Sequence, residues 1–253
     1  METKQSDMMG GLAKGLRVIE AFTADTPRLS ISEAASISGL DRATTRRCLL
    51  TLFEHGYCAY DGKYFTVTPR VLRLGTGCLA SMPLPRIVQP WLDQLSEKIG
   101  QSTSVAILDE GEIVYVARAA QRKVMSIALM PGSRLPAYCT SMGRVLLASL
   151  PGGDARALLE GFPMTPRTQF TLTDPEAVEQ EIAKVRHQGY ACVDQEVEIG
   201  LRSIAVPLKN ARGSVVAALN TGLPASDEPM SAIVGRFLHP LLDVSNELAG
   251  ILA

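Results

Sequence analysis

Apolar residues recur with helical spacing along the N-terminal part of the chain, which predicts a supporting first helix over residues 11–22. A second helix is expected after Ser30, because Glu33 lies three residues later and completes a capping box. Gly39 is expected to end this helix, since glycine adopts a positive φ at little cost. The apolar face of the second helix predicts four buried residues, namely Ile31, Ala34, Ala35 and Ile37.

A third helix is expected after Asp41, which can cap it and which complements the helix dipole. Alternating apolar residues then flank Asp61-Gly62, which predicts a two-residue type I′ hairpin with Lys63 at its tip. Two short helices joined at a glycine and followed by a hairpin are typical of a winged helix-turn-helix, whose second helix enters the major groove of DNA. The buried stripe of the third helix is expected to comprise Thr45, Cys48, Leu49 and Leu52.

Arginine and threonine are concentrated in the first two turns of this third helix. Arginine holds guanine bidentately or clamps phosphate, and threonine offers a hydroxyl to phosphate or a methyl group to thymine. The residues alone leave two alternatives: an amphipathic helix with a solvated basic face, and a winged helix that docks onto a protein. Together with the hairpin tip, the predicted DNA contacts are Arg42, Thr44, Thr45, Arg46, Arg47 and Lys63.

The remainder of the chain mixes helical periodicity with alternating segments that form hairpins. Residues 69–82 predict a connecting helix that ends before Pro83 and Pro85. This helix is either a rigid spacer or an element that passes a rearrangement of the subunits or the ligand to the DNA-binding part. The pattern indicates an α+β fold with a largely antiparallel sheet. Helices are predicted at 88–99, 138–150, 175–188 and 227–252, and strands at 103–108, 112–117, 124–129, 190–193, 202–207 and 214–220.

Composition and motifs indicate the cellular compartment and argue against a metal site and a cofactor. The chain has 253 residues, 46% hydrophobic and 20% charged, with no long uncharged apolar run and no apolar segment at its start. We therefore expect neither a membrane span nor a secretory signal. Five scattered cysteines without a CxxC pair favour reduced thiols in the cytoplasm and no metal site, and no phosphate-binding or dinucleotide-binding motif predicts a cofactor. The net charge of −1 divides into +2 over residues 1–80 and −3 over the remainder, which supports DNA binding only weakly.

A small-molecule site is indicated where a helix is expected to open near Cys139. Free amides at a helix N-terminus, beside the hydroxyls of Thr140 and Ser141 and followed by Met142 and Gly143, suit a carboxylate. Tyr138 is expected to add an aromatic wall, and Arg134 is a candidate clamp for the carboxylate. The alternative is an ordinary capped helix in the core.

Cys139 at this helix start also allows two thiol hypotheses. One is an enzyme nucleophile, for which the base would be His187 or His239, and the other is a redox-sensing regulator. No Cys/His motif surrounds Cys139, so the sequence favours a protein that is not an enzyme.

Several motifs together resemble the IclR family of bacterial transcriptional regulators, over almost the entire chain. They are GLRVI (15–19), ATTRRCL (43–49), LFEHGY (52–57), PAYCTSMGR (136–144), GY (189–190) and EIGLRSIAVP (198–207). Residues 132–144 are especially similar to the PcaR/PcaU/PobR branch, which controls aromatic-acid catabolism through the β-ketoadipate pathway. Many other family members have histidine and lysine in place of Tyr138 and Arg144.

The resemblance implies a ligand-responsive regulator that reads a palindromic operator as a homodimer or a dimer of dimers. It implies a winged helix-turn-helix domain over 11–68, a linker helix over 69–82, and a GAF-like or profilin-like effector-binding and oligomerisation domain over 83–253. The implied effector is a small carboxylate such as 4-hydroxybenzoate, protocatechuate or a β-ketoadipate-like acid. Family pockets also draw on positions that match Asp194 (or Val193, if the alignment slips by one residue), Leu201, Ser203, Asn220 and Thr221.

Overall fold

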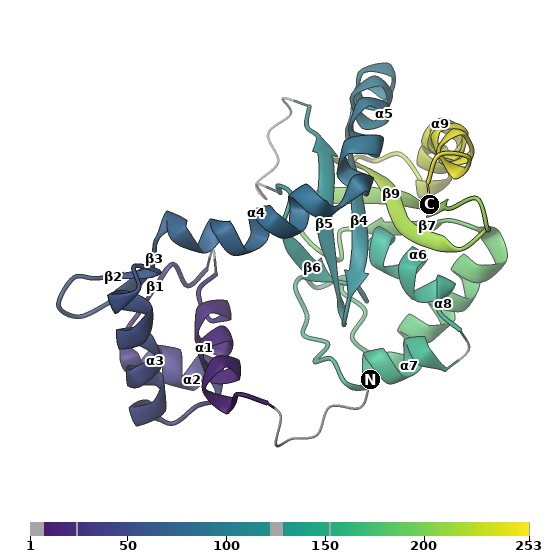
Figure 1. The fold of residues 1–253 in the computed structure, drawn as a ribbon. Coiled ribbons are helices and arrows are strands. Elements are labelled where there is room, and N and C mark those ends of the chain that lie inside the picture. Colours follow the sequence, from purple (N-terminus) through teal and green to yellow (C-terminus); the bar gives the residue numbers. More distant parts are fainter. Residues whose placement is uncertain (1–7, 24, 122–128, 152, 253) are drawn as a thin grey trace. The chain divides into compact units, whose positions relative to one another are not determined.

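The computed structural model describes residues 8–23, 25–121, 129–151 and 153–252. The chain forms two compact units, the first ending at Ala80 and the second beginning at Ser81 (Figure 1). The first unit contains α1 (Gly10–Glu20), β1 (Arg28–Leu29), α2 (Ile31–Ser38), α3 (Arg42–Glu54), β2 (Cys58–Tyr60), β3 (Phe65–Val67), the 3₁₀ turn η2 (Pro69–Val71) and α4 (Leu72–Ser81) except for its last residue.

Local signals set the ends of α2 and α3 as the sequence predicts. The Glu33 amide donates to the Ser30 hydroxyl while the Ser30 amide donates to the Glu33 carboxylate, so the capping box is complete. Gly39 takes φ 65°, and Asp41 accepts from the Thr44 amide at 2.9 Å. The predicted burial of Ile37 is wrong, because this side chain is 51% exposed on the outer face of α2.

The hairpin differs from the predicted two-residue turn. Tyr60 pairs with Phe65, so the connection comprises the four residues from Asp61 to Tyr64. The Asp61 carboxylate accepts from the amides of Lys63 and Tyr64 and holds this turn, which moves the tip to Gly62 and Lys63. Together with β1, the hairpin makes a three-stranded sheet in the order β1-β3-β2.

The second unit is a six-stranded antiparallel sheet in the order β6-β5-β4-β9-β8-β7. Helices α5 and α9 pack on one face, and α6 and α8 pack on the other, with α7 beside α8 (Figure 1). The elements are α5 (Pro83–Ile99), β4 (Ser102–Asp109), β5 (Glu112–Ala119), β6 (Arg134–Pro136), α6 (Ser141–Ser149), α7 (Asp154–Glu160), α8 (Pro175–Gln188), β7 (Ala191–Asp194), β8 (Leu201–Lys209), β9 (Val215–Pro224) and α9 (Met230–Ala249).

Three predictions for this unit need correction. Helix α4 ends at Ser81, before Pro83, as predicted, but the next helix begins at Pro83 and not at Val88, since proline is well tolerated in a first helical turn. Residues 138–140 precede α6, and the sequence missed β6 and α7. The strand predicted at 124–129 lies outside the described residues except for its last position.

None of the described helices is long and apolar enough to cross a membrane.

Candidate functional site

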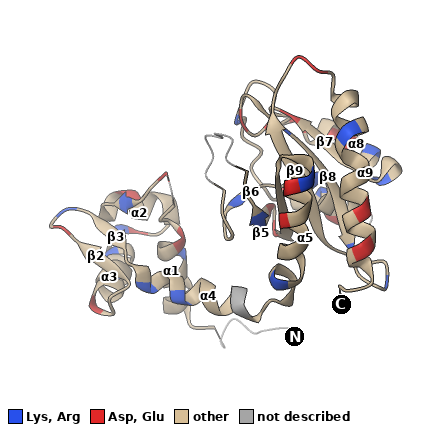
Figure 2. Cartoon of the chain, turned by 90° about the horizontal axis from the view of Figure 1, so that it is seen from above, with Lys and Arg blue, Asp and Glu red and all other residues tan. Residues whose placement is uncertain are grey.

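The outer face of α3 presents basic side chains on the first unit. Arg42, Arg46 and Arg47 are exposed, as the sequence predicts, and blue segments mark basic residues on α3 and on the hairpin connection in Figure 2. Thr45 is fully buried and donates to the Asp41 carbonyl at 2.9 Å, and Thr44 is only 7% exposed. The burial of Thr45 confirms its predicted place in the buried stripe of α3, and both threonines present almost no surface to DNA, contrary to their predicted role as DNA contacts.

Lys63 at the hairpin tip lies over the ring of Tyr64, with its ammonium nitrogen 4.8 Å from the ring centroid. Contact with Tyr64 raises the pKa of Lys63, so this group stays charged at neutral pH. Arg28 of β1 lies over the same ring at 5.0 Å. Sequence reasoning missed Arg28, because β1 has two residues and too little pattern to identify.

The second unit contains a small cavity of about 30 Å³ between the start of α6 and strands β4, β5, β8 and β9. This volume has room for about one water molecule and lies below the range of ordinary small-molecule pockets, so a ligand the size of a hydroxybenzoate requires the walls to move apart. The sequence-predicted residues that line it are Thr140, Ser141, Met142, Leu201, Ser203 and Asn220. The lining residues that sequence reasoning missed are Ser102, Tyr115, Arg118, Leu129, Leu135, Val197 and Gly222.

Arg118 is the cationic residue among the described lining residues. Its guanidinium donates to the Ser104 hydroxyl at 3.0 Å, and no carboxylate of the described residues forms an ion pair with it. Burial lowers the pKa of Arg118, yet a guanidinium remains protonated in proteins. The cavity thus holds a partly desolvated positive charge without an anionic partner, which favours an anionic ligand.

Strand register explains why Arg118 reaches the cavity. Arg118 of β5 pairs with Ser104 of β4, and Ser104 pairs with Asn220 of β9, so the three residues form one polar row across the sheet. Polar residues at such positions within buried strands are a signal that could have identified the row.

Burial raises the pKa of the adjacent Tyr115 to about 12, so its phenol stays protonated.

The start of α6 supplies neutral donors to the same cavity. The Thr140 hydroxyl caps the helix by accepting from the Gly143 amide at 3.1 Å. Ser141 is 1% exposed and its hydroxyl has no hydrogen-bond partner among the described residues. A buried hydroxyl without a partner is costly, and a ligand that accepts or donates there removes the cost. The first amides of α6 also lack intrahelical acceptors.

Five predicted effector residues do not line the cavity. Arg134 is exposed and forms ion pairs with Asp109 and Glu112, so its charge is already compensated. The other four are engaged elsewhere: the Tyr138 hydroxyl donates to the Thr165 carbonyl, Cys139 contacts the Pro136 carbonyl, Asp194 pairs with Arg202, and the Thr221 hydroxyl donates to the Ser102 carbonyl. Val193, the alternative to Asp194, is buried and does not line the cavity either.

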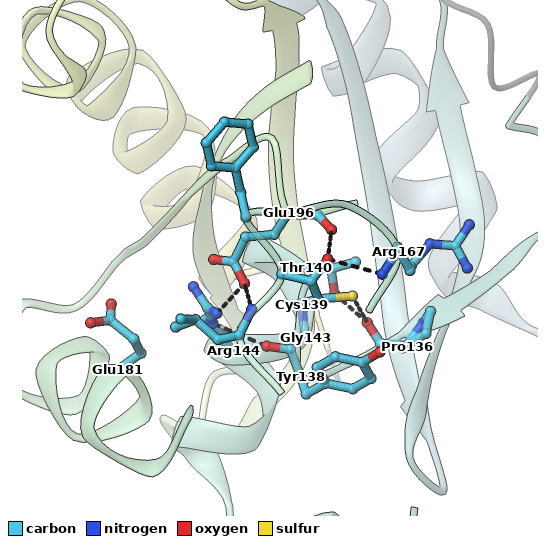
Figure 3. A network of polar contacts seen from close by, with 12 residues as sticks. Pro136, Tyr138, Cys139, Thr140, Gly143, Arg144, Arg167, Glu181 and Glu196 are labelled. Atoms are coloured by element: carbon cyan, nitrogen blue, oxygen red, sulfur yellow. Dashed lines mark hydrogen bonds and ion pairs between the residues drawn. The ribbon is translucent and has the colours of Figure 1, made fainter. Parts of the chain in front are cut away.

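The Cys139 thiol is unsuited to nucleophilic or redox chemistry. Its side chain is fully buried and points to the Pro136 carbonyl, with a sulfur–oxygen distance of 3.8 Å (Figure 3). Burial, with a smaller contribution from Glu196, raises the pKa of this thiol to about 12. His187 and His239 are exposed, and neither bonds to the sulfur. In the described part of the chain, no three histidine, cysteine or acidic residues are grouped so as to hold a metal ion.

Comparison with known protein families gives two matches. Residues 11–62 match the IclR helix-turn-helix domain, and residues 76–247 match the bacterial transcriptional regulator IclR C-terminal domain. The second match alone spans more than half of the chain.

Individual relatives are similar over nearly the full length. The Pca regulon regulatory protein of Pseudomonas putida is 42% identical, over 97% of this chain and 85% of the relative. The p-hydroxybenzoate hydroxylase transcriptional activator of Acinetobacter baylyi is 35% identical, over 99% and 94%. A crystal structure of the PobR inducer-binding domain from Acinetobacter, a double mutant in complex with 3-hydroxybenzoic acid, superposes with a TM-score of 0.63 at 31% identity, covering 68% of this chain and all of that one.

Proposed function

Because the chain belongs to the IclR family of bacterial transcriptional regulators, we propose that it regulates genes of aromatic-acid catabolism in response to a small carboxylic acid. The N-terminal unit binds operator DNA, and the cavity of the C-terminal unit binds the effector. A regulator that binds DNA acts where the genes are, so we expect the protein in the cytoplasm. The family consists of DNA-binding regulators and not of enzymes.

The unpaired Arg118 in the cavity is the observation that carries the effector proposal. A carboxylate that pairs with its guanidinium forms charge-assisted hydrogen bonds and compensates a partly desolvated charge. The orphan hydroxyl of Ser141 and the amide of Asn220 offer partners to a hydroxyl group on the same ligand. An apolar wall that includes Leu129, Leu135 and Val197 suits an aromatic ring.

The relatives support this class of ligand. One relative bears the name of the Pca regulon, another that of the p-hydroxybenzoate hydroxylase gene, and the inducer-binding domain of PobR contains 3-hydroxybenzoic acid. We therefore favour a hydroxybenzoate such as 4-hydroxybenzoate or protocatechuate, and a β-ketoadipate-like acid is the aliphatic alternative. The two thiol hypotheses lose their support, since Cys139 is buried, protonated and outside the cavity.

For DNA we propose that Arg42, Arg46 and Arg47 contact the operator from α3 while Lys63 meets the phosphate backbone from the hairpin. The protein reads a palindromic operator as a homodimer or a dimer of dimers. Exposed apolar side chains on α1 and at its N-cap, those of Leu12, Leu16 and Met9, support a second copy as the partner of this unit.

Replacement of Arg118 tests the effector proposal. We expect Arg118→Met to weaken binding of 4-hydroxybenzoate by about 10–100-fold in calorimetry, the amount that follows from losing a hydrogen bond to a charged group. The matched control is Arg134→Met, which removes an arginine that is already paired with two carboxylates outside the cavity. An equal loss in both variants, or no loss in Arg118→Met, contradicts the proposed site.

A further inference from the structure

The ion pair between Arg144 and Glu196 is the most deeply buried one among the described residues. The two side chains are 2% and 9% exposed, whereas every other ion pair there has a partner that is at least 41% exposed. Arg144 Nη2 lies 2.7 Å from Glu196 Oε2, and Arg144 Nε donates to the Tyr138 carbonyl at 3.1 Å (Figure 3). The pair thus connects α6 to the segment between β7 and β8.

Glu196 also anchors its own segment to the loop that precedes α8. The same Oε2 accepts from the Leu172 amide at 3.1 Å, and the Glu196 carbonyl accepts from the Thr171 hydroxyl at 2.6 Å. The neighbouring Gln195 carbonyl accepts from the Thr168 hydroxyl at 2.7 Å. Residues 195–200 are therefore held by directional bonds from two sides, and Arg144 supplies the bond to α6.

Two walls of the effector cavity flank this ion pair in the sequence. Thr140, Ser141 and Met142 lie within four residues before Arg144, while Val197 follows Glu196 directly. Neither Arg144 nor Glu196 lines the cavity itself. The ion pair thus links the α6 wall to the segment that contributes Val197 and Leu201 to the opposite wall.

We propose that the Arg144–Glu196 pair positions the two walls of the cavity and thereby sets which ligands fit it. This proposal rests on the proposed function of the cavity as the effector site. A buried ion pair adds little net stability compared with apolar side chains of similar volume, because desolvation offsets the attraction. Its hydrogen bonds, however, require one geometry, and binding is sensitive to small displacements of a wall. Arg144 and Glu196 are therefore positioning residues that act through Ser141, Met142 and Val197.

The test is the double variant Arg144→Met/Glu196→Gln. It removes both buried charges, and glutamine keeps an acceptor for the Leu172 amide. The matched control is Arg156→Met/Glu160→Gln, which removes an ion pair whose partners are 60% and 61% exposed. Calorimetry measures binding of 4-hydroxybenzoate and of the larger 6-hydroxy-2-naphthoate, and the methyl resonance of Met142 in the ligand-free protein reports the position of the α6 wall.

We expect the double variant to lose roughly tenfold in its preference for 4-hydroxybenzoate over the naphthoate and to shift or broaden the Met142 resonance, while the control changes neither. An unchanged preference with an unchanged Met142 resonance overturns the proposal. If the wild-type protein binds neither acid, the proposed function fails, and the Met142 resonance alone decides the positioning role. If the double variant does not fold, Arg144→Lys, which keeps the charge but loses the guanidinium geometry, is measured in the same way and judged by the same outcomes.

Discussion

Arg118 and Arg134 belong to the same unit but differ in burial and in whether their charge is paired. Arg134 is exposed and bonded to two carboxylates, whereas Arg118 is partly buried beside serine hydroxyls and tyrosine. The sequence pointed to Arg134, because it lies just before the helix-start motif. Arg118 reaches the cavity only through the pairing of β5 with β4, a long-range feature that a sequence pattern does not display.

Cys139 allows a prediction that follows from its pKa. Alkylation requires the thiolate, and burial raises the pKa of this thiol to about 12, so at about pH 8 the folded protein keeps Cys139 protonated. We expect mass spectrometry to find Cys139 unmodified by iodoacetamide in the folded protein and modified after unfolding. Rapid modification of Cys139 in the folded protein at that pH contradicts the assignment and reopens the redox hypothesis.

At the scale of elements, helix ends were the most predictable features. The capping residues Ser30, Glu33, Gly39 and Asp41 act on neighbours within a few positions, so their roles follow from local sequence. The start of α6 was less predictable, because it depends on how the preceding backbone at Ala137 packs against Gly143, which a local sequence pattern does not display. A Cβ placed on Gly143 lies 2.2 Å from the Ala137 carbonyl oxygen and 2.4 Å from its Cα.

This close approach predicts the effect of Gly143→Ala. The added methyl group meets backbone that cannot move freely, so we expect a loss of about 1–3 kcal/mol in the free energy of unfolding and weaker effector binding. Gly235→Ala in α9 is the control, since a Cβ there meets nothing within 4 Å. It should raise stability by about 0.5–1 kcal/mol. Equal effects of the two substitutions in thermal unfolding contradict the packing assigned to Gly143.

The exposed face of α3 predicts a second result at this scale. We expect Arg46→Ala to lower operator affinity by about 10–100-fold while leaving folding and effector binding intact, because Arg46 is exposed and lies within the first two turns. If Arg46 contacts a phosphate, the variant also shows a weaker salt dependence, because about one fewer counterion is released on binding. If Arg46 contacts a base, the variant instead loses sequence preference at that position. Thr45→Val should act through stability, since Thr45 is buried. Unchanged operator affinity in Arg46→Ala excludes this residue from the interface.

At the scale of the whole molecule, the sequence separated a DNA-binding part from an α+β part and identified the family. It could not supply the strand order β6-β5-β4-β9-β8-β7, which brings residues far apart in the chain into one cavity. Ser102, Gly222 and Ser203 meet there only because β4, β9 and β8 are adjacent. Their convergence depends on tertiary pairing and not on local periodicity.

The central claim is that an acid in the Arg118 cavity changes how the protein binds DNA. A ligand shifts such an equilibrium only through different affinities for the two states, so operator binding and effector binding must depend on each other. The direct test is the operator affinity of the full-length protein measured with and without 4-hydroxybenzoate, in the wild type and in Arg118→Met.

We expect the acid to change the wild-type operator affinity by roughly 5–150-fold, the usual range of allosteric coupling, and to leave that of Arg118→Met unchanged at the same concentration. Without acid, the two proteins should bind the operator equally well, because Arg118 lies in the C-terminal unit. If the acid alters both proteins to the same extent, or if hydroxybenzoates and β-ketoadipate all leave wild-type operator binding unchanged, the account is contradicted.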